Sequence, residues 1–295
     1  MHSLIVENLA KAYGSVQALR GVSFAVDPGE VFGYLGPNGA GKTTTLRIIL
    51  GLVRADGGDV RLFDVAAPDS RSRVDVGYLP GELHLYENLT GGALLEYFAG
   101  FRPGRPPVLR QQLLDALDVE PSALTRRIKF LSHGTKQKLG LTTAMQHDPA
   151  LLLLDEPTTG LDPLVQRAFR SLVLERSRNG RTVFFSSHVL SEVESICGRV
   201  AILRRGELVA VESIESLRSK MVRRLRVRFR GTAPEDLVRL PGVTRSQLTG
   251  SEVSLWIRGD VNPVLRRIAQ AEVEHFVFPE PELEDIFLTY YQASK

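Results

Sequence analysis

Residues 36–43 read Gly36-Pro37-Asn38-Gly39-Ala40-Gly41-Lys42-Thr43 and match the spacing G-x-x-x-x-G-K-[ST] of a phosphate-binding loop. Residues 30–35 before it predict a short buried strand, and residues 43–50 predict a helix that begins where the glycines end. Glycines let the backbone approach a phosphate closely, and the first N–H groups of the helix face the anion. Lys42 can reach the β- and γ-phosphates, and the Thr43 hydroxyl can bind Mg²⁺. The stretch therefore predicts a nucleoside triphosphate site, to which we also assign Thr44.

The bulk properties are those of a water-soluble protein of about two domains. The chain has 295 residues, of which 43% are hydrophobic and 24% charged, and a formal net charge of +3. The longest apolar run, residues 150–154, is far too short to span a membrane, and the first residues lack the apolar segment of a signal peptide. We therefore expect a cytosolic protein whose membrane role, if it has one, comes through a partner. The single cysteine, Cys197, excludes an internal disulfide and a cysteine-based metal site.

Strands alternate with helices over the first two thirds of the chain, which predicts an α/β fold with a largely parallel sheet. A turn at residues 57–59 is expected before a strand at 60–63. Further strands are expected at 74–79, 150–154 and 182–187, and helices at 163–176 and 189–196. The pattern is helical from about 85 to 145. Around residue 215 it changes to short strands and helices, which predicts one domain at 1–215 and a small α+β domain at 216–295.

A second strong motif is the stretch 151–162, LLLLDEPTTGLD. A buried strand that ends in Asp155 and Glu156 delivers both carboxylates to the edge of the sheet that holds the phosphate-binding loop. Asp155 suits a Mg²⁺ partner, and Glu156 suits a general base that polarises the attacking water. Two solvated acids at a strand end are the alternative for either residue alone.

With these motifs the chain resembles the ATPase subunit of an ABC transporter. The resemblance implies a P-loop NTPase of ABC type, with an antiparallel β-subdomain and a helical signature subdomain at about 85–145 beside the parallel sheet. In this family Asp155 and Glu156 stand at the Walker B position and that of the catalytic glutamate. Tyr13 matches the aromatic residue that stacks on adenine, with a surface turn tyrosine as the alternative. His188 matches the switch histidine that binds the γ-phosphate.

The signature motif and the D-loop complete the resemblance. Residues 131–135, LSHGT, match the signature, in which Ser132 and Gly134 are the phosphate contacts, and Asp162 ends the D-loop. His133 and Thr135 depart from the usual glycine and glutamine. At the Q-loop the family's glutamine is replaced by Gly81, and we expect the adjacent Glu82 to substitute as a metal ligand. The resemblance thus implies ATP and Mg²⁺ as ligands, with Lys42, Glu156 and His188 in catalysis.

The tail and one strand of the second domain carry weaker signals. Residues 281–291, PELEDIFLTYY, resemble the ending of ATPase subunits in two-component bacterial exporters, including the drug and antibiotic-resistance group. Taken alone, this stretch is an ordinary amphipathic helix. Arginines alternate with apolar residues along 224–230, which indicates a solvated strand face or, alternatively, attraction to anionic lipid headgroups.

The resemblance also implies the assembly. Each ATP is held between the Walker A of one subunit and the signature of another, so this chain is expected to pair with itself or with a related ATPase subunit. We expect a separate transmembrane permease as partner, docked on residues 83–101, and a peripheral position on the cytoplasmic side of the plasma membrane; those residues could instead be core of the helical subdomain. Nucleic acid is not expected. The alternatives are a soluble ABC ATPase that acts on nucleic acid or ribosomes, and a module that holds ATP without turnover.

Overall fold

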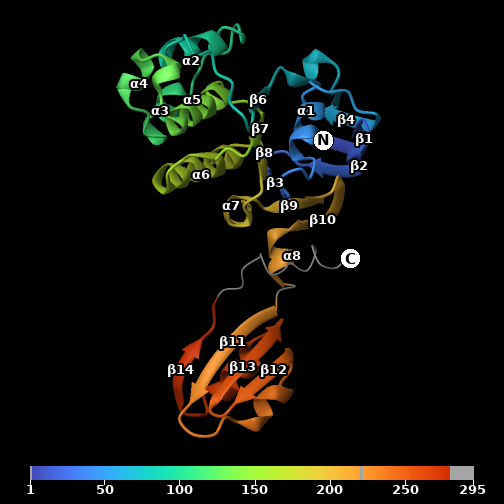
Figure 1. The fold of residues 1–295 in the computed structure, drawn as a ribbon, viewed down its shortest axis with the longest axis vertical. Helices are drawn as coiled ribbons and strands as arrows, with labels where there is room; N and C mark the ends of the chain where they lie inside the picture. Colours follow the sequence, from blue (N-terminus) through green and yellow to red (C-terminus); the bar gives the residue numbers. More distant parts are fainter. Residues whose placement is uncertain (1, 220–221, 280–295) are drawn as a thin grey trace. The chain divides into compact units, whose positions relative to one another are not determined.

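The computed structural model describes residues 2–219 and 222–279, which form two compact units that divide after Val211 (Figure 1). The sequence placed this boundary four residues later, at 215. The difference concerns the last residues of strand β10 (Glu207–Ser213) and the short helix α8 (Ile214–Ser219).

The first unit is built on a six-stranded sheet in the order β10-β9-β3-β8-β7-β6 (Figure 1). The pairs β3–β8, β3–β9, β7–β8 and β6–β7 are all parallel. The other strands of this sheet are β3 (Val31–Leu35), β6 (Val76–Leu79), β7 (Leu151–Asp155), β8 (Thr182–Ser187) and β9 (Arg199–Arg204). Every residue of β3, β7 and β8 is buried, as expected for strands covered on both faces.

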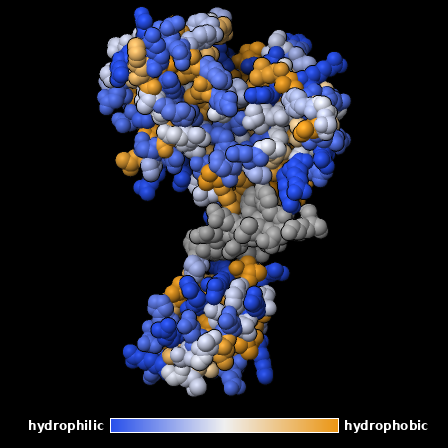
Figure 2. Space-filling model, in the orientation of Figure 1, coloured by the Kyte–Doolittle hydropathy of each residue, from blue (hydrophilic) through white to orange (hydrophobic). Residues whose placement is uncertain are grey.

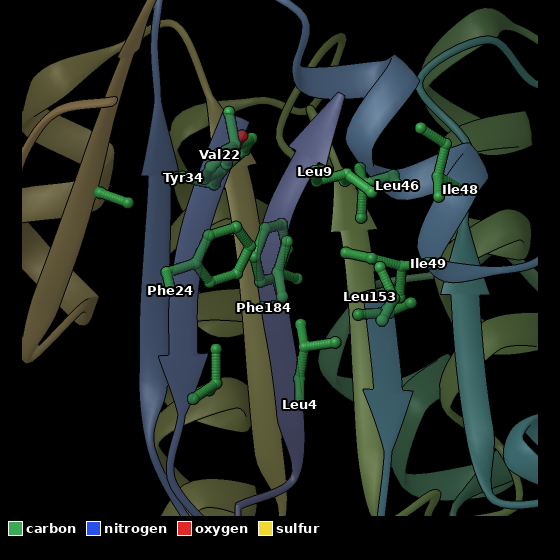
Figure 3. Close-up of a cluster of buried hydrophobic side chains, with 14 of the residues drawn as sticks. Leu4, Leu9, Val22, Phe24, Tyr34, Leu46, Ile48, Ile49, Leu153 and Phe184 are labelled. Carbon is green, nitrogen blue, oxygen red and sulfur yellow. The ribbon is translucent and has the colours of Figure 1, made fainter. Parts of the chain in front are cut away.

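An antiparallel four-stranded sheet in the order β2-β1-β4-β5 packs over this core. Its strands are β1 (Leu4–Tyr13), β2 (Val16–Val26), β4 (Gly57–Leu62) and β5 (Val65–Ala66). Figure 3 shows Phe24 of β2 beside Phe184 of β8, with ring centres 5.8 Å apart, and Leu46 and Ile49 of helix α1 (Lys42–Ile49) in the same cluster. The helix that carries the phosphate-binding loop is therefore fixed by the main hydrophobic core.

Two groups of helices complete the first unit. Helices α6 (Pro163–Arg178) and α7 (Leu190–Ile196) contact β3 and β8. The helical part consists of α2 (Gly91–Ala99), α3 (Arg110–Ala116), α4 (Pro121–Thr125) and α5 (His133–Met145), with short 3₁₀ turns at η1 (Ser70–Arg73) and η2 (Ile128–Phe130). It has a hydrophobic cluster of its own, which includes Leu94, Leu95, Ile128 and Leu139. Its helices run from Gly91 to Met145.

The second unit is a four-stranded antiparallel sheet in the order β12-β13-β11-β14 (Figure 1). Its elements are β11 (Val222–Phe229), η3 (Glu235–Arg239), β12 (Val243–Thr249), β13 (Glu252–Arg258), α9 (Asn262–Ile268) and β14 (Val273–Val277). Alternate residues of β11 and β13 face a core that also contains Leu237, Val264 and Ile268. The helical segments therefore cover one face of the sheet, in the split βαβ arrangement typical of ferredoxin-like folds.

Two local expectations differ from the structure, and a third lies outside the described residues. The turn expected at 57–59 is wrong, because these residues begin strand β4, and the chain instead turns at Phe63 and Asp64 with φ values of 49° and 64°. One of the short helices expected after residue 215, the stretch PEDLVRL at 234–240, is a 3₁₀ turn at Glu235–Arg239. The amphipathic tail at 281–291 lies outside the described residues.

The surface and the helix lengths bear on the membrane expectation. On the face drawn in Figure 2, hydrophobic residues of the first unit are interspersed among hydrophilic ones. Over residues 2–219 and 222–279, each helix is too short or too polar to cross a bilayer.

Candidate nucleotide site

The phosphate-binding loop runs from the end of β3 to the start of α1, as its sequence predicts. Gly41 adopts a φ of 113° directly before the first helical residue, a conformation that favours glycine. A Cβ on Gly41 would lie 2.6 Å from the Ala18 carbonyl oxygen, and one on Gly36 would lie 2.4 Å from that of Leu203. The loop thus needs glycine at both positions because neighbouring backbone approaches it closely.

Two buried hydroxyl groups stabilise the loop through its last glycine. The Thr45 hydroxyl donates to the Gly41 carbonyl oxygen at 3.0 Å, and the Tyr34 hydroxyl lies 3.1 Å from that of Thr45. Burial raises the pKa of Tyr34, so this phenol stays protonated and can donate to Thr45. The pair fixes the last glycine of the loop against the core.

Lys42 is buried and folds back over the loop. Its Nζ donates to the Gly36 carbonyl oxygen at 2.7 Å and to that of Pro37 at 3.3 Å. It also lies 3.2 Å from Oε1 of Glu156, in ion-pair distance but without hydrogen-bond geometry. The ammonium is therefore held at the mouth of the loop, beside the acid that the sequence assigns to catalysis.

Thr43 and Asp155 are adjacent, although 112 residues separate them in the chain. The Thr43 hydroxyl donates to Oδ2 of Asp155 at 2.8 Å, and the Ser186 hydroxyl donates to Oδ1 at 2.8 Å. Asp155 is only 1% exposed. Burial, and after it the nearby Asp155 charge, raises the pKa of Tyr78 to about 12, so this phenol stays protonated beside the carboxylate.

The Thr43 hydroxyl oxygen and the Asp155 carboxylate fit a Mg²⁺ ion. Magnesium sites that also bind nucleotide phosphates commonly use one or two protein oxygens, with phosphates and water as the remaining ligands. The Thr43 hydroxyl and the Asp155 carboxylate are such a donor pair, already in contact. Among the described residues, no three His, Cys, Asp or Glu side chains gather as an all-protein metal site.

Glu156 directly follows strand β7, and its carboxylate lies between Lys42 and His188. Its Oε2 lies 2.8 Å from Nδ1 of His188, which follows the neighbouring strand β8. Its φ is 50°, a left-handed conformation that is strained for glutamate and that occurs often at functional sites. The backbone N–H of Glu156 donates to the Ser186 carbonyl oxygen at 3.0 Å. The structure thus brings Lys42, Thr43, Asp155, Glu156 and His188 to one edge of the parallel sheet.

The sequence reasoning missed Glu192, which connects the two segments that carry Glu156 and His188. The Thr158 hydroxyl donates to its Oε1 at 2.5 Å, and the Ser187 hydroxyl donates to its Oε2 at 2.7 Å. A usable signal was present: two serines end the buried strand at 182–187, and buried hydroxyls need partners.

The signature residues form a second group, beside the D-loop of the same chain. Ser132 caps α5: its Oγ accepts from the Thr135 backbone N–H at 3.2 Å. A Cβ on Gly134 would lie 2.8 Å from the Gly160 carbonyl oxygen, and one on Gly160 would lie 2.4 Å from Nδ1 of His133. The two departures from the family pattern therefore have local contacts, because the Thr135 hydroxyl lies 2.9 Å from that of Ser132 and His133 packs on the D-loop.

Asp162 and Tyr13 have structural settings that the sequence did not specify. Oδ1 of Asp162 accepts from the backbone N–H groups of Leu164 and Val165, both at 3.0 Å, and so caps α6. Tyr13 ends β1 and is 47% exposed, with Nζ of Lys11 5.5 Å from the ring centre. One face of this ring remains a candidate platform for a base.

The structure does not bring Glu82 to the Thr43–Asp155 pair. Its side chain is 88% exposed, and Oε2 lies 3.7 Å from Nε2 of His84. The neighbouring Gly81 is the residue that approaches the pair, because a Cβ there would lie 3.2 Å from Oδ2 of Asp155. Glu82 as a metal ligand therefore finds no support in the position of its carboxylate.

A phosphate-binding loop, an acidic strand end and a helical insertion with a serine-capped signature define a P-loop NTPase of ABC type. The ABC transporter family model matches residues 19–159. The Nod factor export ATP-binding protein I of Paraburkholderia xenovorans is 33% identical to this chain over 96% of it and 94% of the relative. The chain belongs to the ATP-binding proteins of ABC transporters, which confirms the family and the fold expected from the sequence.

Other comparisons agree. An uncharacterized ABC transporter ATP-binding protein of Nostoc sp. is 43% identical over 68% of this chain, and the match spans 62% of that relative's own length. Further relatives are named for linearmycin resistance and for fluoroquinolone export. A solved structure of an ATP-binding subunit of an ABC transporter matches with a TM-score of 0.66 and 30% identity, over 73% of this chain and 91% of that one.

Proposed function

We propose that this chain hydrolyses ATP to energise an ABC exporter through a separate membrane subunit. The observation that carries the proposal is the position of Glu156, whose two carboxylate oxygens lie within 3.2 Å of Lys42 and 2.8 Å of His188. The Thr43–Asp155 pair supports the same site. An acid near the attacking water, a cation for the phosphates and a hydroxyl–carboxylate pair for Mg²⁺ are groups that serve phosphoryl transfer to water.

Each residue has a defined task in this reaction. Lys42 neutralises the β- and γ-phosphates, and its exchange from Glu156 to phosphate frees Oε1 to accept a proton from water. His188 holds Oε2 and orients the carboxylate. When bound by Thr43 and Asp155, Mg²⁺ supplies charge neutralisation at the phosphate oxygens. We assign Tyr13 to stacking on the adenine.

We further propose that the active form is a head-to-tail dimer, with itself or with a related ATPase subunit. Ser132 and Gly134 lie at the N-terminus of the 13-residue helix α5, beside their own D-loop. Backbone N–H groups at such an end bind anions. They would complete the site of a second copy, with Asp162 next to the same junction.

An aromatic cluster supports docking of the membrane subunit on residues 83–101. Tyr86, Tyr97 and Phe101 are 53%, 42% and 66% exposed, and the Tyr97 ring lies 5.0 Å from the centres of both others. Exposed aromatic clusters of this kind mark protein interfaces. The names of the relatives that refer to export support the direction of transport and a position on the cytoplasmic side of the plasma membrane.

The mass of Glu156→Gln in solution tests the hydrolysis and the dimer together. With ATP, this variant should sediment at twice the monomer mass of 32.6 kDa, and its hydrolysis should fall by a factor on the order of 10² to 10⁴. Lys42→Ala is the matched control, which should stay monomeric because it does not hold the phosphates. A Glu156→Gln protein that binds ATP and remains a monomer at all concentrations contradicts the dimer. Salt-sensitive binding to RNA or DNA would instead favour the soluble ABC ATPases.

A further inference from the structure

The second unit has an open sheet face that is rich in arginine. The face opposite its core carries Arg224, Arg226 and Arg228 of β11. These residues pair across the sheet with Trp256, Ser254 and Glu252 of β13. The same register adds three further basic side chains to the face, namely Arg245 of β12, Arg258 of β13 and His275 of β14. The arginines lie on three adjacent strands and are all exposed, so they present an array of charge rather than a pocket.

Among the described residues, acidic side chains balance only a small part of the positive charge on this face. Glu252 is the carboxylate on these rows, and it forms an ion pair with Arg228 at 3.4 Å. No carboxylate among the described residues lies within ion-pair distance of Arg226 or Arg258. The face is therefore complementary to an anionic partner, and guanidinium groups can form bidentate hydrogen bonds with phosphate oxygens.

Trp256 lies between two of the arginines, and this position limits which class of anionic partner the face can bind. Cζ of Arg224 is 5.0 Å from the ring centre, and Cζ of Arg245 is 4.7 Å from it. These two residues come from the strands on either side of β13. A ring covered in this way offers no free platform for nucleotide bases, which single-stranded nucleic acids require. Tryptophan next to arginine is instead typical of the interface between water and lipid headgroups.

We propose that this face, defined by Arg224, Arg226, Arg228, Arg245, Arg258 and Trp256, binds the anionic phospholipid headgroups of a membrane surface. An open sheet face suits contact with a surface, and its charge suits phosphate. The contact is separate from the nucleotide site, because all of its residues belong to the second unit. The inference goes beyond the proposed ATPase function and can be tested without ATP.

Trp256 is the only tryptophan of the 295 residues, so its fluorescence reports on this face alone. We would titrate the full chain with vesicles of phosphatidylglycerol and phosphatidylcholine, and with vesicles of pure phosphatidylcholine. Vesicles that contain phosphatidylglycerol should shift the Trp256 emission to shorter wavelength and cosediment with the protein. Rising salt should weaken this binding, and neutral vesicles should cause neither effect.

Arg226→Gln with Arg258→Gln removes two charges of the face and leaves the contacts of Trp256 intact. Binding should fall roughly 30-fold, because each basic side chain near an anionic surface contributes a factor of roughly five. The matched control is Arg239→Gln with Arg266→Gln, on η3 and α9 at the other face of the sheet, which should change binding less than threefold. Arg226→Lys with Arg258→Lys should retain most of the binding, which separates loss of charge from loss of folding.

Several outcomes would overturn the proposal. If the protein binds neutral vesicles as tightly as anionic ones, or if the control variant loses as much binding as the test variant, this face does not bind anionic lipid. A Trp256 shift with millimolar inorganic phosphate but not with vesicles assigns a small-anion site instead. Tighter binding of a single-stranded oligonucleotide than of the vesicles assigns nucleic acid. ATP hydrolysis by the Arg226→Gln, Arg258→Gln protein should match that of the unaltered chain, so failure here leaves the proposed function standing.

Discussion

Nδ1 of His188 lies 2.8 Å from Oε2 of Glu156, and the two residues directly follow neighbouring parallel strands of the central sheet. The register that pairs Asp155 with Ser186 places both side chains at the same edge. The structure therefore places the histidine against the carboxylate that we propose as the general base, whereas the sequence assigned His188 to the γ-phosphate.

His188→Ala should lower kcat for ATP hydrolysis by roughly 10² or more, because the carboxylate loses the partner that orients it. Steady-state phosphate release measures this change. His84→Ala is the control, as the His84 side chain is 88% exposed and lies 3.7 Å from the carboxylate of Glu82 rather than beside Glu156. Equal rates for the two variants would contradict the proposed role of His188.

Glu192 should act as a positioning residue. Glu192→Ala removes the acceptor shared by Thr158 and Ser187, and kcat should fall roughly tenfold, the effect of about 1.5 kcal/mol of hydrogen bonding to a charged group. ATP affinity, measured by calorimetry, should change less than twofold. Glu192→Gln keeps hydrogen-bonding atoms at both positions and should recover most of the rate. A loss confined to thermal stability, with kcat unchanged, would limit Glu192 to a structural role.

Gly81, rather than Glu82, should govern the Mg²⁺ dependence. Gly81→Ala places a Cβ 3.2 Å from Oδ2 of Asp155, a contact tight enough to displace the carboxylate from Thr43. The Mg²⁺ concentration for half-maximal hydrolysis should rise several-fold. Glu82→Ala should leave this concentration unchanged, because the Glu82 side chain is exposed. The reverse pattern would restore Glu82 as the metal ligand.

Asp162 should make stability depend on pH. Hydrogen bonds from the backbone N–H groups of Val165 and Leu164 lower the pKa of this carboxyl below its usual 3.8. A carboxyl whose pKa is lowered by folding stabilises the native state above the unfolded pKa, and that contribution is lost as pH falls through the folded value. Asp162→Ala should therefore be less stable than the unaltered chain at pH 7, and the gap should narrow below pH 3.8. Urea unfolding at pH 7 and below pH 3.8 measures the difference in the free energy of unfolding between the two proteins. An equal difference at the two pH values would contradict the role of Asp162 as a helix cap.

The sequence already contained most of the central fold and of the nucleotide loop. The loop at 36–43 contains glycines, which allow a close approach of the backbone to a phosphate. It also contains a lysine and a threonine at fixed spacing from these glycines. The continuous apolar run at 150–154 fixed a buried strand and placed Asp155 and Glu156 at its end. Local patterns were less informative at 57–59, where pairing with β1 turns a glycine-rich stretch into strand β4.

Three relationships came only from the tertiary structure, because each joins residues far apart in the chain or depends on strand register. Glu156 meets His188 and Lys42 through strand order, and Thr158 meets Glu192 through the packing of α7. The basic face of the second unit exists because the register of three strands aligns arginines that are separate in the sequence. The sequence by itself determined which groups we assign to phosphate, metal and water. The tertiary structure decided which of them touch, since contact depends on the pairing of strands that no local pattern encodes.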